Sequence, residues 1–509
     1  MLFRSVDYEI ESKIRRSALN YLNIPINLEN RHAPLLISSC LPLNCSSEEN
    51  SIVGRFRPMR LENALGFLPV YDGPYRKGYK LWQSTRGFPT SFDIFGGDQN
   101  RTTVILGKMG SGKSVINNTL ILEFRARFPE GIIIVIDKKT SYQKSSDLIG
   151  GKVVRFTKEN FKKAPYSPFA VKDWKDEDIE LVISFITTAI SESNPKAQIM
   201  DEHTEVLSEA LKICIKLQEE DQEYALKEGG EIHPHFIWKD VLEQLEAAAV
   251  NKGFKSTAPV DELRRWTTSF SKTGQLGFLF CEYEKEEKFS ESLNFIVYDL
   301  EGISDPRLQT IAARLVGLKV SREVLRYPES IPKLIIFEEL GVYLEGDSQE
   351  TQEQANRLVC NITKTIRKKN GIPVGITNAV DDFFTKAGGK SFWQQSTQKI
   401  FLPFTSEMVG SLYERIEKKE IQGLGKADLD IIKSLHIKDG HYSQAYVMSD
   451  VADFKASVNL PLSPSMYALV NTSPLTNQRY MDLKKSGKTT LEALDIDAKE
   501  FAEKKRRKE

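Results

Sequence analysis

The amino-acid sequence predicts an α/β protein with a mainly parallel central sheet and a helical segment inserted between two of its strands. Short runs rich in β-branched residues recur along the middle of the chain, each bounded by glycine, proline or charge and separated by helix-like stretches. A parallel sheet that is buried on both faces requires this pattern. The predicted strands are residues 102–106, 131–137, 294–300, 333–338, 372–377 and 399–404.

The helical insertion is predicted between the second and third of these strands. This stretch is rich in Glu, Lys, Leu and Ala, and its apolar residues recur at a spacing of three to four, as on one face of a helix. The chain of 509 residues is long enough for several domains. We therefore expect a partial N-terminal lead-in domain at 1–85, a nucleotide-binding core at 86–172 and 289–460, an inserted helical subdomain at 173–288, and a C-terminal helical tail at 461–509.

Charge and cysteine content restrict the environment and the partners. Lys and Arg total 70, as do Asp and Glu, so no global field attracts the chain to nucleic acid or to anionic lipid. The five cysteines lack disulfide or metal spacing, which favours a reducing compartment. The N-terminus resembles no secretory signal, and no apolar run approaches the roughly 20 residues of a spanning helix. We expect a cytoplasmic protein that associates with a membrane only peripherally, through partners.

The segment Gly107–Ser114 matches the phosphate-binding pattern G-x-x-x-x-G-K-[ST], with a predicted strand before it and a predicted helix after it. Its glycines let successive backbone N–H groups face the phosphates of ATP, and the helix N-terminus adds positive potential. Lys113 is expected to bridge the β- and γ-phosphate oxygens during catalysis, and Ser114 to ligate Mg²⁺. The alternative is a chance glycine-rich turn. The predicted ATP-binding residues are Gly107, Lys108, Met109, Gly110, Ser111, Gly112, Lys113, Ser114 and Val115.

A second G-K-T sequence, at Gly487–Thr489, is predicted to be a decoy. Asp482 stands where the pattern requires a glycine, and no apolar strand precedes it. A carboxylate at that position would repel phosphate. We interpret Gly487 as a turn before a terminal helix.

Two carboxylates end the predicted strand at 333–338, which is the arrangement called Walker B. By position, Glu338 is the magnesium-side residue and Glu339 is the catalytic base that polarises the attacking water. The usual first residue is Asp, so Glu338 adds one methylene between the backbone and the metal shell. The alternative is a strand that ends in two solvated acids.

Two further side chains are candidates for catalysis. Asn378 follows the strand at 372–377 and would lie near the γ-phosphate, where its amide could orient water; a plain strand-end cap is equally compatible. Arg367 belongs to a cationic stretch before Gly371, which is the ordinary pattern of a helix C-terminus. An arginine-finger or DNA-facing role for Arg367 is the alternative.

Taken together, these segments resemble the TraC type of conjugative-transfer ATPase, which is related to the VirB-class ATPases of type IV secretion. The match runs from about residue 55 to the end, and only the phosphate loop is specific on its own. Its points, in order, are Ser91–Phe95 before Asn100, Gly107–Ser114, Val135–Asp137 with Ser141 and Tyr142, Gly274–Phe280, Val297–Glu301, Glu338 with Glu339, Ile366–Lys368 with Gly371, Ile376–Asn378 with Asp381, and His441–Gln444.

The resemblance implies a RecA-like P-loop motor with an α-helical insertion. Such motors form hexamers, dock on the cytoplasmic face of a secretion channel, and power pilus assembly or substrate transfer. An arginine of one subunit reaches the nucleotide of the next; Arg367 is the first candidate here, followed by Arg264, Arg265 and Arg314. The family usually has Asp at 338, Gln at 378 and Glu at 444, so the departures put the catalytic rate in question more than the fold.

Two other functions remain open from the sequence. One is a DNA-pumping translocase of the FtsK or HerA kind, which shares the core, although the neutral chain shows no clear DNA-reading domain; DNA is therefore a candidate partner. The other is a nucleotide-regulated scaffold with weak hydrolysis, which Glu338 and Asn378 leave open. The rate of ATP hydrolysis with and without DNA separates the three.

Overall fold

A computed structural model gives the structure of the chain. The chain divides into two compact units, Met1–Tyr71 and Asp72–Glu509. The structure describes residues 81–84, 89–91, 93–95, 101–137, 141–156, 167–169, 171, 174–228, 236–280, 294–303, 305–344, 359–360, 363–364, 366–421, 423–438, 442–449 and 454–506. Most of the predicted lead-in at 1–85 therefore lies outside the described residues.

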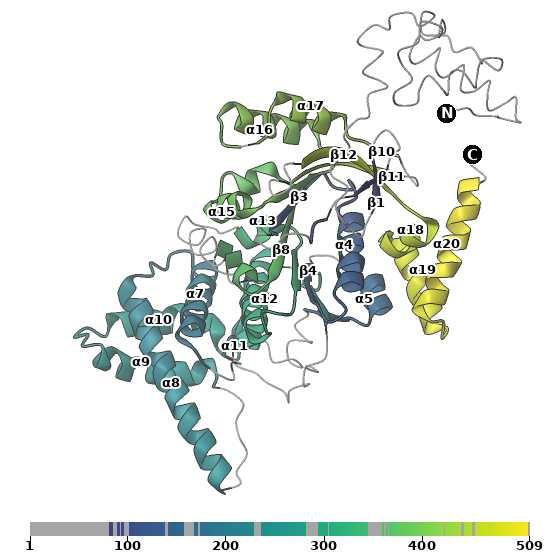
Figure 1. Cartoon of the computed structure of the whole chain (residues 1–509). Coiled ribbons are helices and arrows are strands. Elements are labelled where there is room, and N and C mark those ends of the chain that lie inside the picture. Colours follow the sequence, from purple (N-terminus) through teal and green to yellow (C-terminus); the bar gives the residue numbers. More distant parts are fainter. Residues whose placement is uncertain are drawn as a thin grey trace, which may run out of the picture. The chain divides into compact units, whose positions relative to one another are not determined.

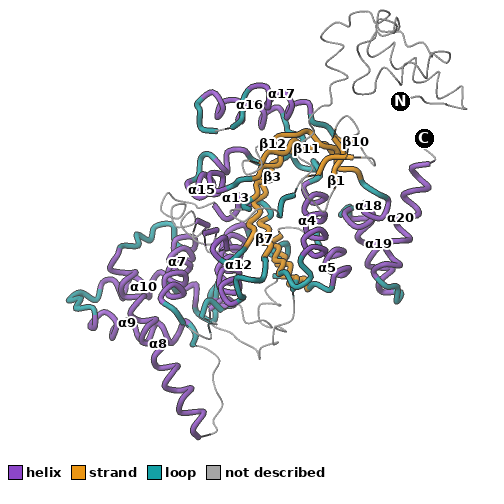
Figure 2. Tube along the Cα trace, in the orientation of Figure 1, coloured by secondary structure: helices purple, strands orange, loops and turns teal. Residues whose placement is uncertain are grey.

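One mixed sheet runs through the second unit (Figures 1 and 2). Its order is β2-β1-β12-β11-β9-β3-β8-β7-β4-β6-β5, with β10 beside β11. From β9 to β5 all neighbours are parallel. The parallel strands are β3 (Thr103–Leu106), β4 (Ile132–Asp137), β5 (Lys152–Arg155), β6 (Phe295–Asp299), β7 (Lys333–Phe337), β8 (Gly371–Thr377) and β9 (Gln398–Phe401).

Antiparallel strands extend the sheet beyond β9, and the sequence did not predict them. They are β1 (Leu81–Ser84), β2 (Pro89–Ser91), β10 (Ile437–Lys438), β11 (Tyr442–Ser449) and β12 (Phe454–Pro461). Strand β1 lies in the range predicted as lead-in, yet it pairs with β12 of the sheet. The domain limits themselves remain a prediction.

Helices cover both faces of the sheet because the strand side chains alternate between two apolar clusters. Ile105, Ile133 and Val135 pack with α4 (Lys113–Arg127), whereas Val104 and Ile134 point into the cluster on the other face. Figure 1 shows the same division, with α4 on one side and α12 on the other. The helices of the core are α5 (Gln143–Ile149), α12 (Pro306–Arg326), α13 (Leu340–Leu344), α15 (Ala387–Gln395), α16 (Ser406–Glu417), α17 (Lys426–Ser434) and the 3₁₀ helix η3 (Val380–Phe383).

The range predicted as a helical insertion contains helices in its described part. They are α7 (Asp176–Ser193), α8 (Asp201–Glu228), α9 (Trp238–Asn251), α10 (Ala258–Trp266), η2 (Thr268–Phe270) and α11 (Gly277–Phe280). Buried aromatic rings hold them together, including Phe270 and Phe280, which stack with centroids 4.1 Å apart.

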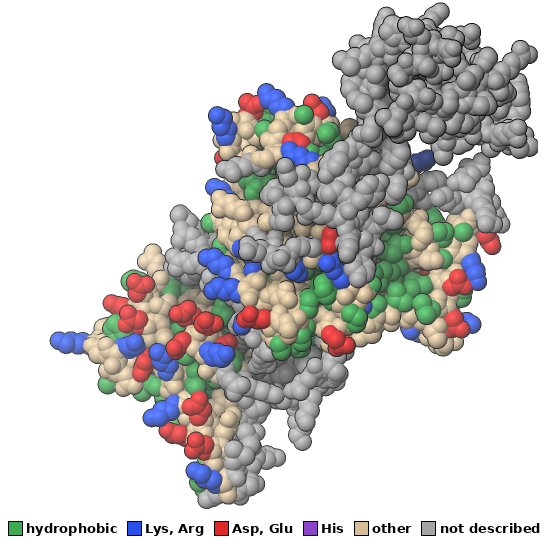
Figure 3. All heavy atoms as spheres, viewed as in Figure 1, with side chains coloured by type: hydrophobic (Ala, Val, Ile, Leu, Met, Phe, Trp, Pro, Cys, Tyr) green, Lys and Arg blue, Asp and Glu red, His purple; other side chains and the backbone are tan. Residues whose placement is uncertain are grey.

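On the face seen in Figure 3, side chains of both charge signs are interspersed over these helices. Within the described residues, no helix is both long enough and apolar enough to cross a membrane.

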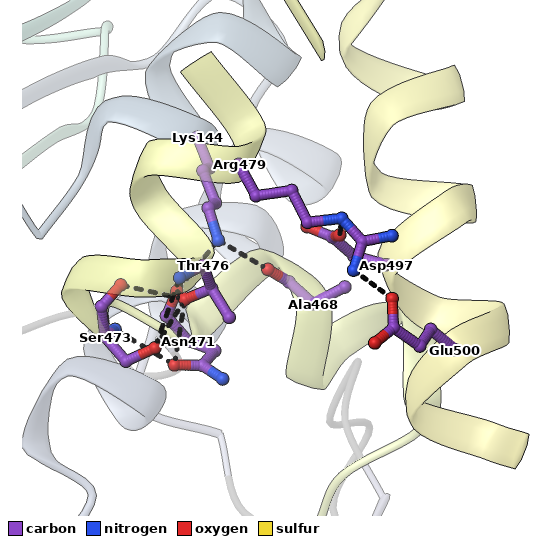
Figure 4. A network of polar contacts seen from close by, with 8 residues as sticks. All are labelled: Lys144, Ala468, Asn471, Ser473, Thr476, Arg479, Asp497 and Glu500. Atoms are coloured by element: carbon purple, nitrogen blue, oxygen red, sulfur yellow. Dashed lines mark hydrogen bonds and ion pairs between the residues drawn. The ribbon is translucent and has the colours of Figure 1, made fainter. Parts of the chain in front are cut away.

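The C-terminal helices α18 (Pro464–Val470), α19 (Pro474–Lys485) and α20 (Thr490–Arg506) dock on α5. The ammonium of Lys144 on α5 donates to the carbonyl oxygens of Ala468 at 3.0 Å and Asn471 at 2.8 Å, which fixes the end of α18 (Figure 4). Arg479 of α19 pairs with Asp497 at 3.2 Å and with Glu500, both on α20. The predicted C-terminal tail is therefore packed against the core, through α5.

The decoy G-K-T sequence forms a turn, as predicted. Gly487 has a φ of 87°, and α20 begins three residues later. The hydroxyl of Thr489 accepts from the backbone N–H of Glu492 at 3.3 Å, and the Glu492 carboxylate accepts from the N–H of Thr489 at 2.8 Å. This reciprocal cap starts a helix and leaves no phosphate cradle.

Candidate nucleotide-binding site

The phosphate loop connects β3, in the middle of the sheet, to the N-terminus of α4. Gly110 and Gly112 have φ values of 73° and 97°. Residues other than glycine rarely adopt this left-handed backbone conformation. A Cβ on Gly107 would lie 2.5 Å from the Oγ of Ser111 and 2.7 Å from the Cβ of Leu402. Glycine is therefore favoured at 110 and 112 by the backbone conformation and at 107 by close packing.

Two distant strands hold the loop from outside. The backbone N–H of Lys108 donates to the carbonyl of Pro403, just after β9, at 3.0 Å. The hydroxyl of Ser443, on β11, donates to the carbonyl of Ser111 at 2.9 Å, and a Cβ on Gly112 would lie 3.2 Å from the same hydroxyl. Sequence reasoning missed this contact, because Ser443 lies 332 residues from the loop and appeared only within a family motif.

Lys113, the first residue of α4, folds back over the loop. Its ammonium donates to the carbonyls of Gly107 at 2.9 Å and Lys108 at 2.8 Å. The Lys113 side chain thus extends across the phosphate loop to its first two residues. The hydroxyl of Ser111 is buried and has no hydrogen-bond partner among the described residues. A buried donor of this kind fits a phosphate oxygen as its partner.

The carboxylate of Glu338, directly after β7, is held by two donors that the sequence did not identify as contacts. The amide Nδ2 of Asn117, on α4, donates to Glu338 Oε1 at 2.9 Å and to the hydroxyl oxygen of Tyr142 at 3.0 Å. The Tyr142 hydroxyl in turn donates to the same carboxylate oxygen. Tyr142 precedes α5 and is fully buried.

The pKa of Glu338 is raised above its usual value, first by burial and then by the charge of Glu339. The hydrogen bonds from Tyr142 and Asn117 and the charge of Lys113 act in the opposite direction. Burial also raises the pKa of Tyr142 well above its usual value, followed in size by the charge of Glu338. Tyr142 is therefore a neutral donor to the carboxylate.

Glu339 follows in a turn with a φ of 52°, an uncommon value for a residue with a side chain. The N–H of Glu338 still continues the sheet, donating to the carbonyl of Ile136 on β4 at 3.0 Å. The chain thus leaves the sheet at Glu339. An unusual backbone conformation beside a site is often part of the site's geometry.

Asn378 stands at the tip of β8, and β8 lies between β3 and β7 in the sheet. The carboxyl ends of parallel strands meet at one edge, so Asn378 lies between the phosphate loop and the acidic pair. Its Oδ1 atom is buried and has no hydrogen-bond partner within the described part of the chain. The structure therefore brings the predicted residues from β3, β7 and β8 together at one edge.

Arg367 lies at the opposite edge of the sheet, four residues before β8 begins. Its guanidinium donates to the Oε1 of Gln395, at the end of α15, at 2.8 Å, and burial lowers the pKa of Arg367. Arg367 therefore does not join the phosphate loop of its own chain. A role in catalysis would require a neighbouring subunit.

The other arginine candidates divide by burial. Arg264 on α10 is half exposed and pairs with Glu246 at 2.9 Å, and Arg265 is 71% exposed. Arg314 is fully buried and pairs with Glu192 at 3.0 Å. The expectation that Arg314 could reach a neighbouring nucleotide is therefore wrong, since its charge is committed inside the fold.

With this geometry in place, one comparison identifies the family. The model of the TraG P-loop domain matches residues 78–469. The chain belongs to the TraG P-loop family. The predicted relationship to the conjugation and type IV secretion ATPases is thereby confirmed, and the narrower TraC type remains a prediction. The family match includes the phosphate loop, the acidic pair and Asn378.

A solved structure supports the fold of this TraG P-loop chain. VirB4 of Thermoanaerobacter pseudethanolicus is similar with a TM-score of 0.55 and 17% identity, over 77% of this chain and 99% of that one. This likeness confirms the predicted RecA-like P-loop fold. The plasmid coupling protein TrwB, in a complex with ADP and Mg²⁺, is similar with a TM-score of 0.48 and 13% identity, over 75% of this chain and 89% of that one. No curated protein matches this chain in sequence.

Proposed function

We propose that this TraG P-loop chain is an ATP-hydrolysing motor of a conjugative or type IV secretion system, which powers pilus assembly or substrate transfer. The observation that carries the proposal is the convergence of the phosphate loop, Asn378 and the acidic pair at one edge of the sheet. Strand tips at this edge are where parallel α/β sheets bind ligands.

The residues of the phosphate loop fit a nucleoside triphosphate. The left-handed glycines expose backbone N–H groups, and α4 directs its N-terminus at the same point. The Lys113 ammonium, now on two loop carbonyls, is placed to exchange them for β- and γ-phosphate oxygens. The Ser111 hydroxyl, which is buried and has no partner in the part of the chain that the structure describes, supports the same assignment.

The residues at the edge also fit Mg²⁺, with Ser114 and Glu338 as the side chains that would hold it and its water shell. When bound, the ion would neutralise charge that develops on the phosphates. Glu338 is fixed by Asn117 and Tyr142 and is therefore oriented in advance. Glu339 would take the proton of the attacking water, and Oδ1 of Asn378, which has no hydrogen-bond partner among the described residues, would orient that water.

Assembly is part of the proposal. We infer a homo-oligomer, a hexamer by analogy with the family, in which Arg367 of one subunit is the first candidate to reach the nucleotide of the next. Channel proteins of the secretion system would hold the ring peripherally at the membrane, and DNA is a candidate substrate. Sizing by light scattering with and without a non-hydrolysable ATP analogue tests ring formation.

The decisive experiment compares Lys113→Ala with Lys488→Ala, which removes the exposed lysine of the decoy turn. Binding of Mg-ATP is measured by calorimetry, and phosphate release is measured in the same preparations. We expect Lys113→Ala to abolish hydrolysis and weaken binding, and Lys488→Ala to behave as the wild type. ATP binding by Lys113→Ala as tight as that of the wild type would refute the proposed site.

Adding DNA to the same assay separates the related functions. Turnover that is independent of DNA agrees with a secretion motor, and strong stimulation by DNA favours a translocase. ATP binding without measurable turnover, in the wild-type protein assembled as a ring, favours the scaffold.

A further inference from the structure

Asp382, in η3, lies where the tips of β7 and β8 meet. Its carboxylate accepts a hydrogen bond from the Thr377 hydroxyl, the last residue of β8. The Thr377 hydroxyl also accepts from the N–H of Ala379 at 3.1 Å. These bonds fix the residues on either side of Asn378, the residue whose amide oxygen remains unpartnered in the described structure.

The Asp382 carboxylate also contacts the first turn of α13, which follows β7. A Cβ on Gly341 would lie only 2.4 Å from Asp382 Oδ2, so the carboxylate packs directly on the Gly341 backbone. The ammonium of Lys386 donates to Asp382 Oδ1 at 3.1 Å and to the carbonyl of Gly341 at 3.4 Å. Gly341 lies two residues after Glu339.

One carboxylate thus joins the end of β8, which precedes Asn378, to the start of α13, which follows Glu339. Asp382 and Lys386 are 15% and 18% exposed, so their ion pair is partly shielded from water. The side chain of Asp381, the residue before Asp382, has other contacts. It is 56% exposed, and its carboxylate accepts from Arg415 at 3.1 Å and from Ser411 at 2.9 Å, both on α16. The two adjacent aspartates therefore have separate contacts.

We propose that Asp382 is a positioning residue for ATP hydrolysis, which holds the Asn378 amide in register with Glu339 through Thr377, Lys386 and Gly341. The inference rests on the proposed function, because it assigns a role relative to the attacking water. Asp382 supports the water side of the site and has no contact with the phosphate loop among its described bonds. Its loss should therefore lower turnover and spare nucleotide affinity.

The test replaces Asp382 with Asn and uses Asp381→Asn as the matched control. Thr377 and Lys386 donate to different oxygens of Asp382, and Asp382→Asn replaces one of these oxygens by an NH2 group, which cannot accept from the donor that faces it. We expect kcat of Asp382→Asn to fall about tenfold, because small displacements of reacting groups have large effects on rate. KM for ATP and the Kd for a non-hydrolysable analogue should stay unchanged. Asp381→Asn should retain the wild-type kcat.

A second pair of variants keeps the test independent of folding defects. Thr377→Val preserves shape and removes the hydroxyl, whereas Thr377→Ser keeps the hydroxyl. We expect Thr377→Val to match the loss of kcat in Asp382→Asn and Thr377→Ser to restore it. The double variant Thr377→Val with Asp382→Asn should be no worse than the poorer single variant.

Each result decides the inference. An unchanged kcat in Asp382→Asn, or equal loss in Thr377→Val and Thr377→Ser, overturns it. So does a loss of ATP affinity that parallels the loss of kcat, since this would mean that Asp382 only supports the fold. If the wild type hydrolyses ATP and Lys113→Ala does not, the proposed function is upheld whatever the result for Asp382→Asn. The proposed function and the proposed role of Asp382 can therefore fail separately.

Discussion

The contact between β11 and the phosphate loop leads to a quantitative prediction for Ser443→Ala. The Ser443 hydroxyl holds the carbonyl of Ser111 at 2.9 Å. A trans peptide directs its C=O and the following N–H to opposite sides, so this bond aims the N–H of Gly112 into the cradle. Ser443→Ala removes the hydroxyl and leaves the neighbouring backbone intact.

The magnitude follows from the burial of the bond. Ser443 is 5% exposed, so the carbonyl of Ser111 would lose its partner in a site with little access to water. Losing such a bond costs about 1 kcal/mol, and up to about 3 kcal/mol if the acceptor stays unsatisfied. If about 1 kcal/mol of this loss is taken from the free energy of ADP binding, the Kd for ADP rises about fivefold.

Calorimetric titration with ADP, combined with urea unfolding, measures both quantities. The control is Ser457→Ala, on the neighbouring strand β12 opposite Tyr446, which should leave the Kd unchanged. A lower free energy of unfolding with an unchanged Kd would refute the idea that Ser443 orients the loop. It would leave the hydroxyl as a support of the fold alone.

Two further predictions use matched positions in the structure. Gly112→Ala and Gly110→Ala both place a side chain on a left-handed backbone, which costs about 1 kcal/mol in each variant. Only the Cβ of the Gly112 variant contacts Ser443, at 3.2 Å from its hydroxyl oxygen. ADP titration should therefore show the larger loss of affinity in Gly112→Ala, and equal losses would contradict the packing. Arg314→Met removes the cation that lies 3.0 Å from the buried Glu192 carboxylate, so urea unfolding should show a loss of about 3–5 kcal/mol, partly recovered by adding Glu192→Leu. ATP turnover per folded molecule should be retained in that double variant, whereas its loss would restore Arg314 as a candidate finger.

Local patterns were sufficient for the parallel core. The buried runs at β3, β4, β6, β7, β8 and β9 were each predicted to within a few residues, because a strand covered on both faces is apolar along its whole length. The sequence motif also predicted the phosphate loop. Its left-handed glycines at 110 and 112 follow from the backbone curvature that the motif requires. Such features depend on neighbours in sequence, so the sequence alone determines them.

Contacts between distant segments were decided by the tertiary structure. Strands β11 and β12 alternate less clearly, and their place beside β9 brings Ser443 to the phosphate loop. Asn117 and Tyr142 on Glu338, Asp382 between two strand tips, and the buried charge of Arg314 likewise depend on which helix packs on which strand. A hydrogen bond or an ion pair needs a partner within about 3 Å, and no local pattern states which of several hundred residues will come that close. The sequence therefore determined the chemistry of the site, and the packing determined which side chains hold that chemistry in place.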